Sequence, residues 1–115
     1  MPNLCVSCTF NPPVVTVLGA ALRDDTIRSL ETRLPLTTST AFNSNKESVK
    51  FAHLSNPDHL CLEMPQHFCD EIHKSAMYLA ITQSLEEEGW RLRASNSLAN
   101  PTNDKETCKM FFTRS

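Results

Sequence analysis

Glycine is almost absent from this chain, because the 115 residues include only Gly19 and Gly89. Loops that cradle phosphate groups, such as the G-x-G-x-x-G turn and the P-loop, require at least two closely spaced glycines. Since the two glycines lie far apart in the sequence, nucleotide sites of either type are excluded.

The chain also lacks an excess of positive charge and a long hydrophobic run. Its formal net charge is −2 and its pI is about 6.0. Sequence-independent binding of nucleic acid depends on several clustered cations, so the composition argues against nucleic acid as a main partner. The longest apolar run, 14–22, contains Thr16 and is far shorter than the roughly 20 residues that cross a bilayer. We therefore expect no attachment to a membrane.

The N-terminal residues lack the basic segment of a secretory signal, and the five cysteines are an odd number. Thiols inside the cell stay reduced. We therefore expect a cytoplasmic or nuclear protein whose cysteines act as small core residues.

The remaining composition is that of an ordinary globular domain. Hydrophobic residues make up 40% of the chain and charged residues 21%, which is typical of folded proteins. A chain of this length buries one core. We predict one α+β domain that spans residues 1–115.

Alternating apolar and polar residues predict the strands. Pro12 and Pro13 favour a turn between the first two strands, which then form a hairpin. The fourth strand is short and stops before Pro65, so it is predicted at an edge. Phe111 and Phe112 point to opposite faces of the last strand, which indicates an interior position. The predicted strands are 4–10, 14–18, 49–54, 60–64, 90–95 and 107–113.

Two helices are predicted between these strands. The first begins at Asp24 or Asp25 and is halted by Pro35. The segment 35–48 is rich in Ser, Thr and Asn, and we expect it to form a mobile loop. The second helix runs from position 66 or 67 to 88, a stretch without proline or glycine.

The end of the second helix has a recognisable cap. Gly89 in the left-handed conformation is typical of a Schellman motif, and Trp90 then folds back onto the last turn. The predicted fold has two helices packed on one face of a mostly antiparallel sheet of four to six strands. The order is β-β-α-β-(β)-α-β-β.

The long helix has apolar residues on two sides. One stripe follows helical spacing through Phe68, Ile72, Ala76 and Leu79. One of two such stripes covers the sheet, and the other requires a partner, which is the 35–48 loop, the first helix or another chain. We expect the second stripe to bind a protein partner or a second copy of the chain. Its residues are Met77, Ile81 and Leu85.

Three consecutive acidic residues end this helix, where exposed negative charge costs roughly 0.3–1 kcal/mol each. The arginines that follow offer compensation. Two interpretations are open: a solvated acidic end that these arginines partly neutralise, or a charged docking surface. The candidate docking residues are Glu86, Glu87, Arg91 and Arg93.

Cys5 and Cys8 have the spacing of a zinc knuckle or a redox pair, but on a strand they point to opposite faces. We assign no catalytic, metal-binding or cofactor-binding residue. An alternative function is a small thiol enzyme, which requires a base beside a cysteine. The residues available for it are Cys61, His67, Cys69 and His73.

A second alternative is the binding of single-stranded nucleic acid by the last two strands. Stacking rings and cations are the groups that such binding requires. The rings are Trp90, Phe111 and Phe112, and the cations are Arg91, Arg93, Lys109 and Arg114.

In the C-terminal half, a long helix ends in Gly89-Trp90, a strand and a polar loop follow, and the last strand carries Phe111-Phe112. This arrangement resembles a family of small uncharacterised eukaryotic α+β domains. The resemblance implies the fold and no catalytic activity. The residues that carry it are Leu85, Gly89, Trp90, Leu92, Ser95, Leu98, Asp104, Thr107, Phe111 and Phe112.

The function that these observations favour is protein interaction without catalysis. The partner is another protein or a second copy of the chain, and the long helix or the charged corner after it provides the contact surface.

Overall fold

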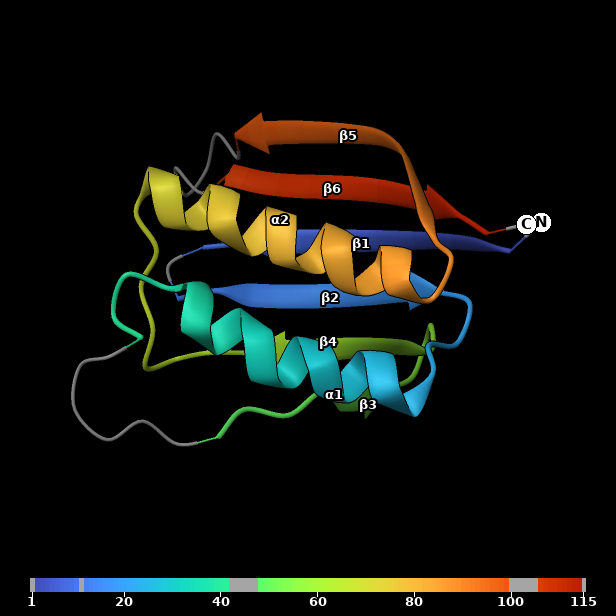
Figure 1. Ribbon diagram of the computed structural model, residues 1–115, viewed down its shortest axis with the longest axis horizontal. Coiled ribbons are helices and arrows are strands. Elements are labelled where there is room, and N and C mark those ends of the chain that lie inside the picture. Colours follow the sequence, from blue (N-terminus) through green and yellow to red (C-terminus); the bar gives the residue numbers. More distant parts are fainter. Residues whose placement is uncertain (1, 11, 42–47, 100–105, 115) are drawn as a thin grey trace.

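The computed structural model describes residues 2–10, 12–41, 48–99 and 106–114. It confirms the predicted α+β fold, with two helices side by side on one face of a six-stranded antiparallel sheet (Figure 1). The strand order is β3-β4-β2-β1-β6-β5. The strands are β1 (Asn3–Thr9), β2 (Val14–Gly19), β3 (Ala52–Leu54), β4 (His59–Glu63), β5 (Arg91–Ala99) and β6 (Glu106–Thr113), and the helices are α1 (Asp24–Arg33), the 3-10 helix η1 (Leu34–Thr37) and α2 (Glu71–Glu87).

The centre of the sheet follows the predicted alternation. Leu4, Val6 and Cys8 of β1 are buried, and they face the helices. The last strand, β6, lies between β1 and β5, as its two aromatic faces indicated. The fourth strand, β4, is not at an edge, because it pairs with both β2 and β3. The edge strand on this side of the sheet is β3, which has only three residues, and β5 is the other edge.

The helix α2 begins at Glu71, later than predicted. The side chain of Asp70 accepts a hydrogen bond from the backbone N–H of His73 at 2.9 Å and so caps the helix. The preceding residues are held by another segment, since the Ser39 N–H donates to the Phe68 carbonyl at 2.9 Å. The Asp70 N–H also donates to Ser39 Oγ at 2.9 Å. These contacts keep 67–70 out of the helix.

The α-helix α1 ends at Arg33, shortly before Pro35, as predicted, but the chain continues as a 3-10 helix that contains Pro35. This 3-10 helix, η1, continues directly from α1, because proline is tolerated in the first turn of a helix. The predicted mobile loop at 35–48 is anchored in its first part: Thr38 is buried, and its hydroxyl lies 2.8 Å from Nδ1 of His67. Residues 42–47 of that loop lie outside the described residues.

The stripe that was expected to bind a partner is instead the core face of α2. Met77, Ile81 and Leu85 are fully buried against the sheet, so they offer no surface for association. Ile72 and Leu79 on the other side are 77% and 59% exposed. Both stripes are apolar, and hydrophobic spacing alone does not determine which one faces the sheet.

The C-terminal end of α2 confirms the predicted Schellman cap. Gly89 has φ of +95°, and its N–H donates to the Glu86 carbonyl at 2.9 Å. The Trp90 N–H donates to the Leu85 carbonyl at 3.1 Å. This pair of bonds defines the motif, and it turns the Trp90 side chain fully into the core. None of the described helices is both long and apolar enough to cross a bilayer.

Candidate functional site

The third glutamate at the end of α2 is buried and structural. Glu88 Oε1 accepts a hydrogen bond from the Arg23 backbone N–H at 2.7 Å. Its Oε2 accepts from Trp90 Nε1 at 2.8 Å and from Arg114 Nη1 at 3.0 Å. The Arg114 guanidinium also lies 5.3 Å from the centre of the Trp90 ring. One carboxylate thus joins the start of α1, the end of α2 and the C-terminal residues.

This environment holds the pKa of Glu88 below its ordinary value. Burial raises the pKa, but the hydrogen bonds from Arg23, Thr26 and Trp90 and the positive charge of Arg114 outweigh burial. The carboxylate therefore stays ionised and satisfied inside the fold, which explains why acid is tolerated at this helix end. We assign it to stability and not to binding.

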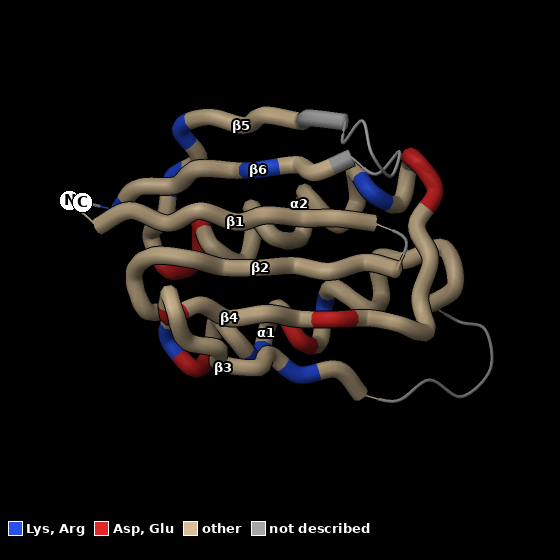
Figure 2. The backbone as a smooth tube through the Cα atoms, turned by 180° about the vertical axis from the view of Figure 1, so that it is seen from behind, with Lys and Arg blue, Asp and Glu red and all other residues tan. Residues whose placement is uncertain are grey.

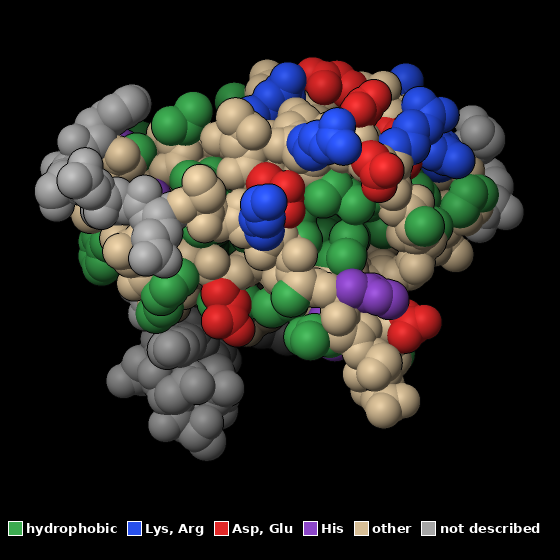
Figure 3. All heavy atoms as spheres, turned by 90° about the horizontal axis from the view of Figure 1, so that it is seen from below, with side chains coloured by type: hydrophobic (Ala, Val, Ile, Leu, Met, Phe, Trp, Pro, Cys, Tyr) green, Lys and Arg blue, Asp and Glu red, His purple; other side chains and the backbone are tan. Residues whose placement is uncertain are grey.

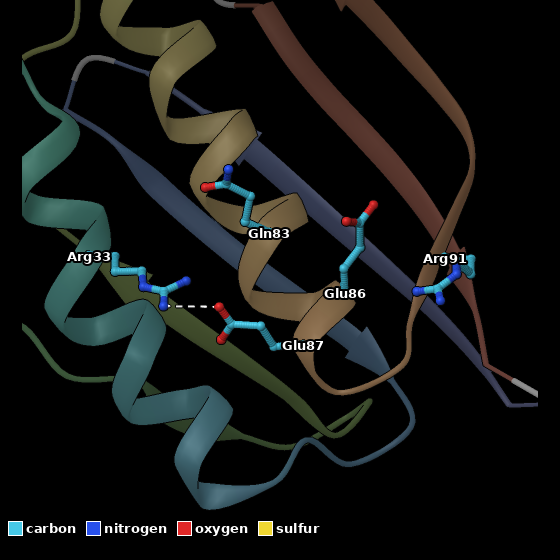
Figure 4. Close-up of a pocket in the computed structure, with 5 residues that line it drawn as sticks. All are labelled: Arg33, Gln83, Glu86, Glu87 and Arg91. Carbon is cyan, nitrogen blue, oxygen red and sulfur yellow. Dashed lines mark hydrogen bonds and ion pairs between the residues drawn. The ribbon is translucent and has the colours of Figure 1, made fainter.

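The other two glutamates face solvent and form the charged corner, defined here as Arg33, Gln83, Glu86, Glu87 and Arg91. These residues line a hollow of about 700 Å³. Arg33 Nη2 lies 3.1 Å from Glu87 Oε1 (Figure 4). Glu86 projects from α2 on the side of β5, where Arg91 lies (Figure 4). Arg91 Nη1 donates to the Trp90 carbonyl at 3.2 Å.

Arg93 does not line this hollow, although the sequence grouped it with Arg91. The pairing of β5 with β6 shifts register between Leu92 and Ala94, which is the mark of a β-bulge. Arg93 Nε donates to Thr113 Oγ1 at 2.8 Å. The bulge thus directs the two arginines to different surroundings, a separation that strict alternation does not predict.

An apolar groove between α2 and β5 continues from the charged corner. Its volume is about 320 Å³, and β6 forms its floor. Leu79 of α2 and Leu92 of β5 are large, exposed side chains on its two walls. The groove and the corner adjoin, because Thr82 and Leu92 line the groove while Gln83 and Arg91 line the corner. The lining residues are Tyr78, Leu79, Thr82, Leu92, Ser95, Cys108 and Met110.

The sequence did not predict this groove. The exposed leucine at position 79 belonged to the stripe assigned to the sheet, and Leu92 was expected to point inward. Leu92 does face the helix layer, where it pairs with buried Phe112. It remains 41% exposed because α2 does not extend over β5.

A third hollow, of about 370 Å³, lies between α1 and the β3–β4 edge. Apolar residues such as Leu22, Ile27 and Leu60 line it, and His53 and His59 lie at its border. Figure 3 shows apolar side chains gathered in this hollow below the charged residues of the helix layer, with histidine beside them. His59 Nδ1 lies 2.7 Å from the Pro57 carbonyl oxygen.

The residues of the expected thiol site lie in environments that do not favour a nucleophile. Cys61 is on β4, opposite Thr16 and Ala52. Cys69 is buried, and burial raises the pKa of its thiol to about 11. The nearby Asp70 adds to this rise, and the Ser39 hydrogen bond offsets only part of it. A thiolate nucleophile requires the opposite shift.

The two histidines of that site have other contacts. Nδ1 of His67 lies 2.8 Å from the Thr38 hydroxyl, and Nδ1 of His73 lies 2.6 Å from Asp70 Oδ1. Within the described residues, no group of three or more His, Cys, Asp or Glu side chains is arranged to hold a metal ion.

The expected nucleic-acid surface retains one exposed ring. Trp90 and Phe112 are buried in the core, whereas Phe111 is 42% exposed on the opposite face of the sheet. One ring is a poor platform for successive bases, each of which stacks on its own aromatic side chain.

Comparisons with known proteins give one informative relationship. No family model matches the chain, and no curated protein does. One similar protein is a conserved kinetoplastid-specific protein from Trypanosoma cruzi, whose crystal structure superposes on this one with a TM-score of 0.83. The two sequences are 51% identical, and the match covers 100% of this chain and 97% of the T. cruzi chain. The chain therefore belongs to the same family as this conserved kinetoplastid-specific protein.

Proposed function

We propose that the protein is a non-catalytic protein-binding module that uses the α2–β5 surface. This surface comprises Ile72, Leu79, Leu92 and the adjoining charged corner. The observation that carries the proposal is the exposure of two large apolar side chains, Leu79 and Leu92, on the walls of one groove. Ile72 is also exposed and lies seven residues before Leu79 on the same helix. Contiguous exposed apolar surface with a polar rim is typical of protein interaction sites.

The position of the groove favours a helix as its occupant. Six strands spaced about 4.8 Å apart make a sheet about 24 Å wide, whereas two helices of about 10 Å diameter cover roughly 20 Å. The uncovered strip is β5, at one side of α2 (Figure 1). An amphipathic helix of a partner protein would lie there beside α2, with apolar residues at i, i+3 or i+4 and i+7 against Leu79 and Leu92.

The exposed residues of α2 have the spacing that such a neighbour requires. Ile72, Leu79 and Glu86 are seven residues apart in turn, so they follow one line along the helix. The line begins apolar and ends in the charged corner. Charge at the rim fixes orientation and speeds encounter more than it adds affinity, so we assign contact energy to the leucines and orientation to Glu86 and Arg91.

Photo-crosslinking in cells tests the proposal. A crosslinking amino acid replaces Leu79 in one variant and Leu92 in another. The control variant carries it at Leu36 of η1, which is 58% exposed, almost as much as Leu79, and lies on the α1 side of the helix layer. We expect the same protein to be captured from positions 79 and 92, and not from position 36.

A second variant separates specific from adventitious capture. Leu79→Lys, combined with the crosslinker at position 92, removes an apolar wall of the groove and should abolish the adduct. Leu36→Lys in the same background should leave it unchanged. Equal capture from position 36, or an adduct that survives Leu79→Lys, would exclude the α2–β5 surface as the binding site.

A further inference from the structure

No layer formed by the described residues covers the second face of the sheet. Among the described residues, both helices pack on one side, and Figure 2 shows the strands from behind with no helix in front of them. We call this side the open sheet face. It does not include the α2–β5 groove, which lies on the helix side, so the inference below is independent of the proposed function.

One row of side chains crosses the open sheet face from edge to edge. The strand register places a residue of each strand beside the next. Leu54, Leu18 and Phe111 in this row are 45%, 40% and 42% exposed. From β3 to β5 the row is Leu54, His59, Leu18, Cys5, Phe111 and Ala94.

The next two rows on the Ser7 side of it are made mostly of small uncharged residues, whereas the row on its other side includes Asn3, Thr113 and Arg91. Within the apolar row and these next two rows, among the described residues, the only Lys, Arg, Asp or Glu residues are Lys109 of β6 and Glu63 of β4. Figure 2 marks a basic position on β6 and an acidic position on β4. The second row is Ala52, Cys61, Thr16, Ser7, Lys109 and Asn96, and the third includes Glu63, Val14, Thr9 and Thr107. Small side chains leave this face flat enough for another sheet to approach to the usual 10 Å.

The two charges are arranged symmetrically about the middle of the sheet. In the order β3-β4-β2-β1-β6-β5, Glu63 is on the second strand from one edge and Lys109 on the second strand from the other. A two-fold axis parallel to the strands, between β2 and β1, therefore exchanges the positions of β4 and β6. Each Glu63 would then lie near Lys109 of the other copy, one row apart along the strands.

We propose that the open sheet face binds a second copy of the same chain, back to back, around this axis. Leu18 then lies over Cys5 of the second copy, and Phe111 lies over its His59. The apolar row is thus covered by itself, as an isologous interface requires. Lys50 lines the same hollow as Glu63, so the carboxylate already has a cation of its own chain nearby, and the intermolecular pairs mainly set the register.

The size of the face predicts a weak dimer. Six strands about 4.8 Å apart and five residues of about 3.3 Å along each give roughly 400 Å² in projection. Stable interfaces bury about 800 Å² of accessible surface on each partner. The accessible area is larger than this projected area because the side chains make the surface uneven. The interface is therefore expected to be smaller than that of a typical stable dimer, and the dimer should form only at high protein concentration.

Sedimentation velocity from low micromolar to near-millimolar protein tests this inference. Wild-type protein should shift from monomer to dimer over this range. Phe111→Lys and Leu18→Lys should each weaken the dimer by roughly tenfold, because they place charge in the apolar row. Leu36→Lys, on the helix side of the molecule, should not change the association. Circular dichroism should show all three variants folded, since the substituted side chains are exposed.

A charge-reversal experiment distinguishes this arrangement from any other self-association. Glu63→Lys alone and Lys109→Glu alone place like charges together twice in each dimer and should weaken association several-fold. An equimolar mixture of the two variants restores both opposite-charge pairs and should associate like wild type.

Three outcomes would overturn the inference. In the first, wild-type protein stays monomeric at every concentration. In the second, neither Phe111→Lys nor Leu18→Lys weakens the dimer. In the third, the mixture of Glu63→Lys and Lys109→Glu associates no more strongly than either variant alone. The first would leave the face to a different partner.

Discussion

The indole Nε1 of Trp90 donates a 2.8 Å hydrogen bond to the carboxylate of Glu88, two residues before it in the chain. Both side chains are buried. The same carboxylate accepts from the Arg23 backbone and from Arg114, so the turn after α2 is fixed to both the start of α1 and the end of the chain. This arrangement sets the direction of β5 and hence one wall of the groove.

Removal of the Glu88 carboxylate should destabilise the fold strongly. Glu88→Ala leaves the Trp90 and Arg23 N–H groups without their acceptor, and an unsatisfied buried donor costs about 1–3 kcal/mol. The Arg114 guanidinium also loses its partner, but its side chain is 34% exposed and can be solvated. Urea unfolding measures this as a lower free energy of unfolding. Glu87→Ala is the control: its pair with Arg33 is exposed and is worth at most about 1 kcal/mol. Equal costs would show that the Glu88 contacts are dispensable.

The lowered pKa of Glu88 predicts a pH dependence of stability. A carboxyl group with a lower pKa in the folded than in the unfolded state stabilises the fold above its unfolded pKa, about 4.3 for Glu. This contribution is lost as the pH falls through the folded pKa. The difference in free energy of unfolding between wild type and Glu88→Gln should therefore be constant above about pH 5 and shrink at lower pH. A difference that grows on acidification would contradict the assignment.

The two glycines should differ in their tolerance of alanine. A Cβ at Gly19, which has φ of +123°, would lie 2.5 Å from the backbone oxygen of Asn3. At Gly89 the nearest atoms belong to the Arg114 side chain, at 3.5 Å, so the cost there is mainly that of the left-handed backbone, about 1 kcal/mol. Thermal unfolding should show a larger loss for Gly19→Ala than for Gly89→Ala. The reverse order would mean that the β2 turn relaxes freely.

Thiol reactivity should follow burial. Burial raises the pKa of Cys69 to about 11 and, together with Cys108, raises that of Cys8 still further, so both remain protonated at neutral pH. Mass spectrometry after alkylation should show Cys5 and Cys61, which are partly exposed, modified first. Cys8 and Cys69 should react only as fast as the chain opens. Rapid alkylation of Cys69 in the folded protein would revive the thiol-enzyme alternative.

Truncation of a side chain should cost much more stability on the buried face of α2 than on its exposed face. Met77→Ala removes a fully buried side chain and should lower the free energy of unfolding by about 2–5 kcal/mol. Leu79→Ala, two positions along the same helix, removes an exposed one and should change stability by less than about 1 kcal/mol. Urea unfolding of the two variants distinguishes core from surface. Similar losses would mean that the helix is rotated from the orientation described here.

This contrast marks where prediction from sequence succeeded and where it failed. The Schellman cap was predictable because Gly89 and Trp90 are adjacent and the chemistry is local. The role of Glu88 was not, because its partners Arg23 and Arg114 are 65 and 26 residues away in the sequence. Local pattern does not report such contacts.

The candidate site was predicted in part for the same reason. The sequence located charged residues at 86–91, and the structure brings Glu86, Glu87 and Arg91 around one hollow. The sequence did not distinguish the buried stripe of α2 from the exposed one, because both are apolar and only packing against the sheet separates them. The bulge after Leu92 likewise separated Arg93 from Arg91, because a register shift depends on the neighbouring strand.

The most direct test of the α2–β5 surface is the affinity of the crosslinked partner for two lysine variants of equal initial exposure. Isothermal titration calorimetry should show Leu79→Lys weakening binding by at least roughly tenfold, about 1.4 kcal/mol, while Leu36→Lys binds like wild type. If both variants bind like wild type, or if both lose affinity equally, the groove between α2 and β5 is not where the partner binds.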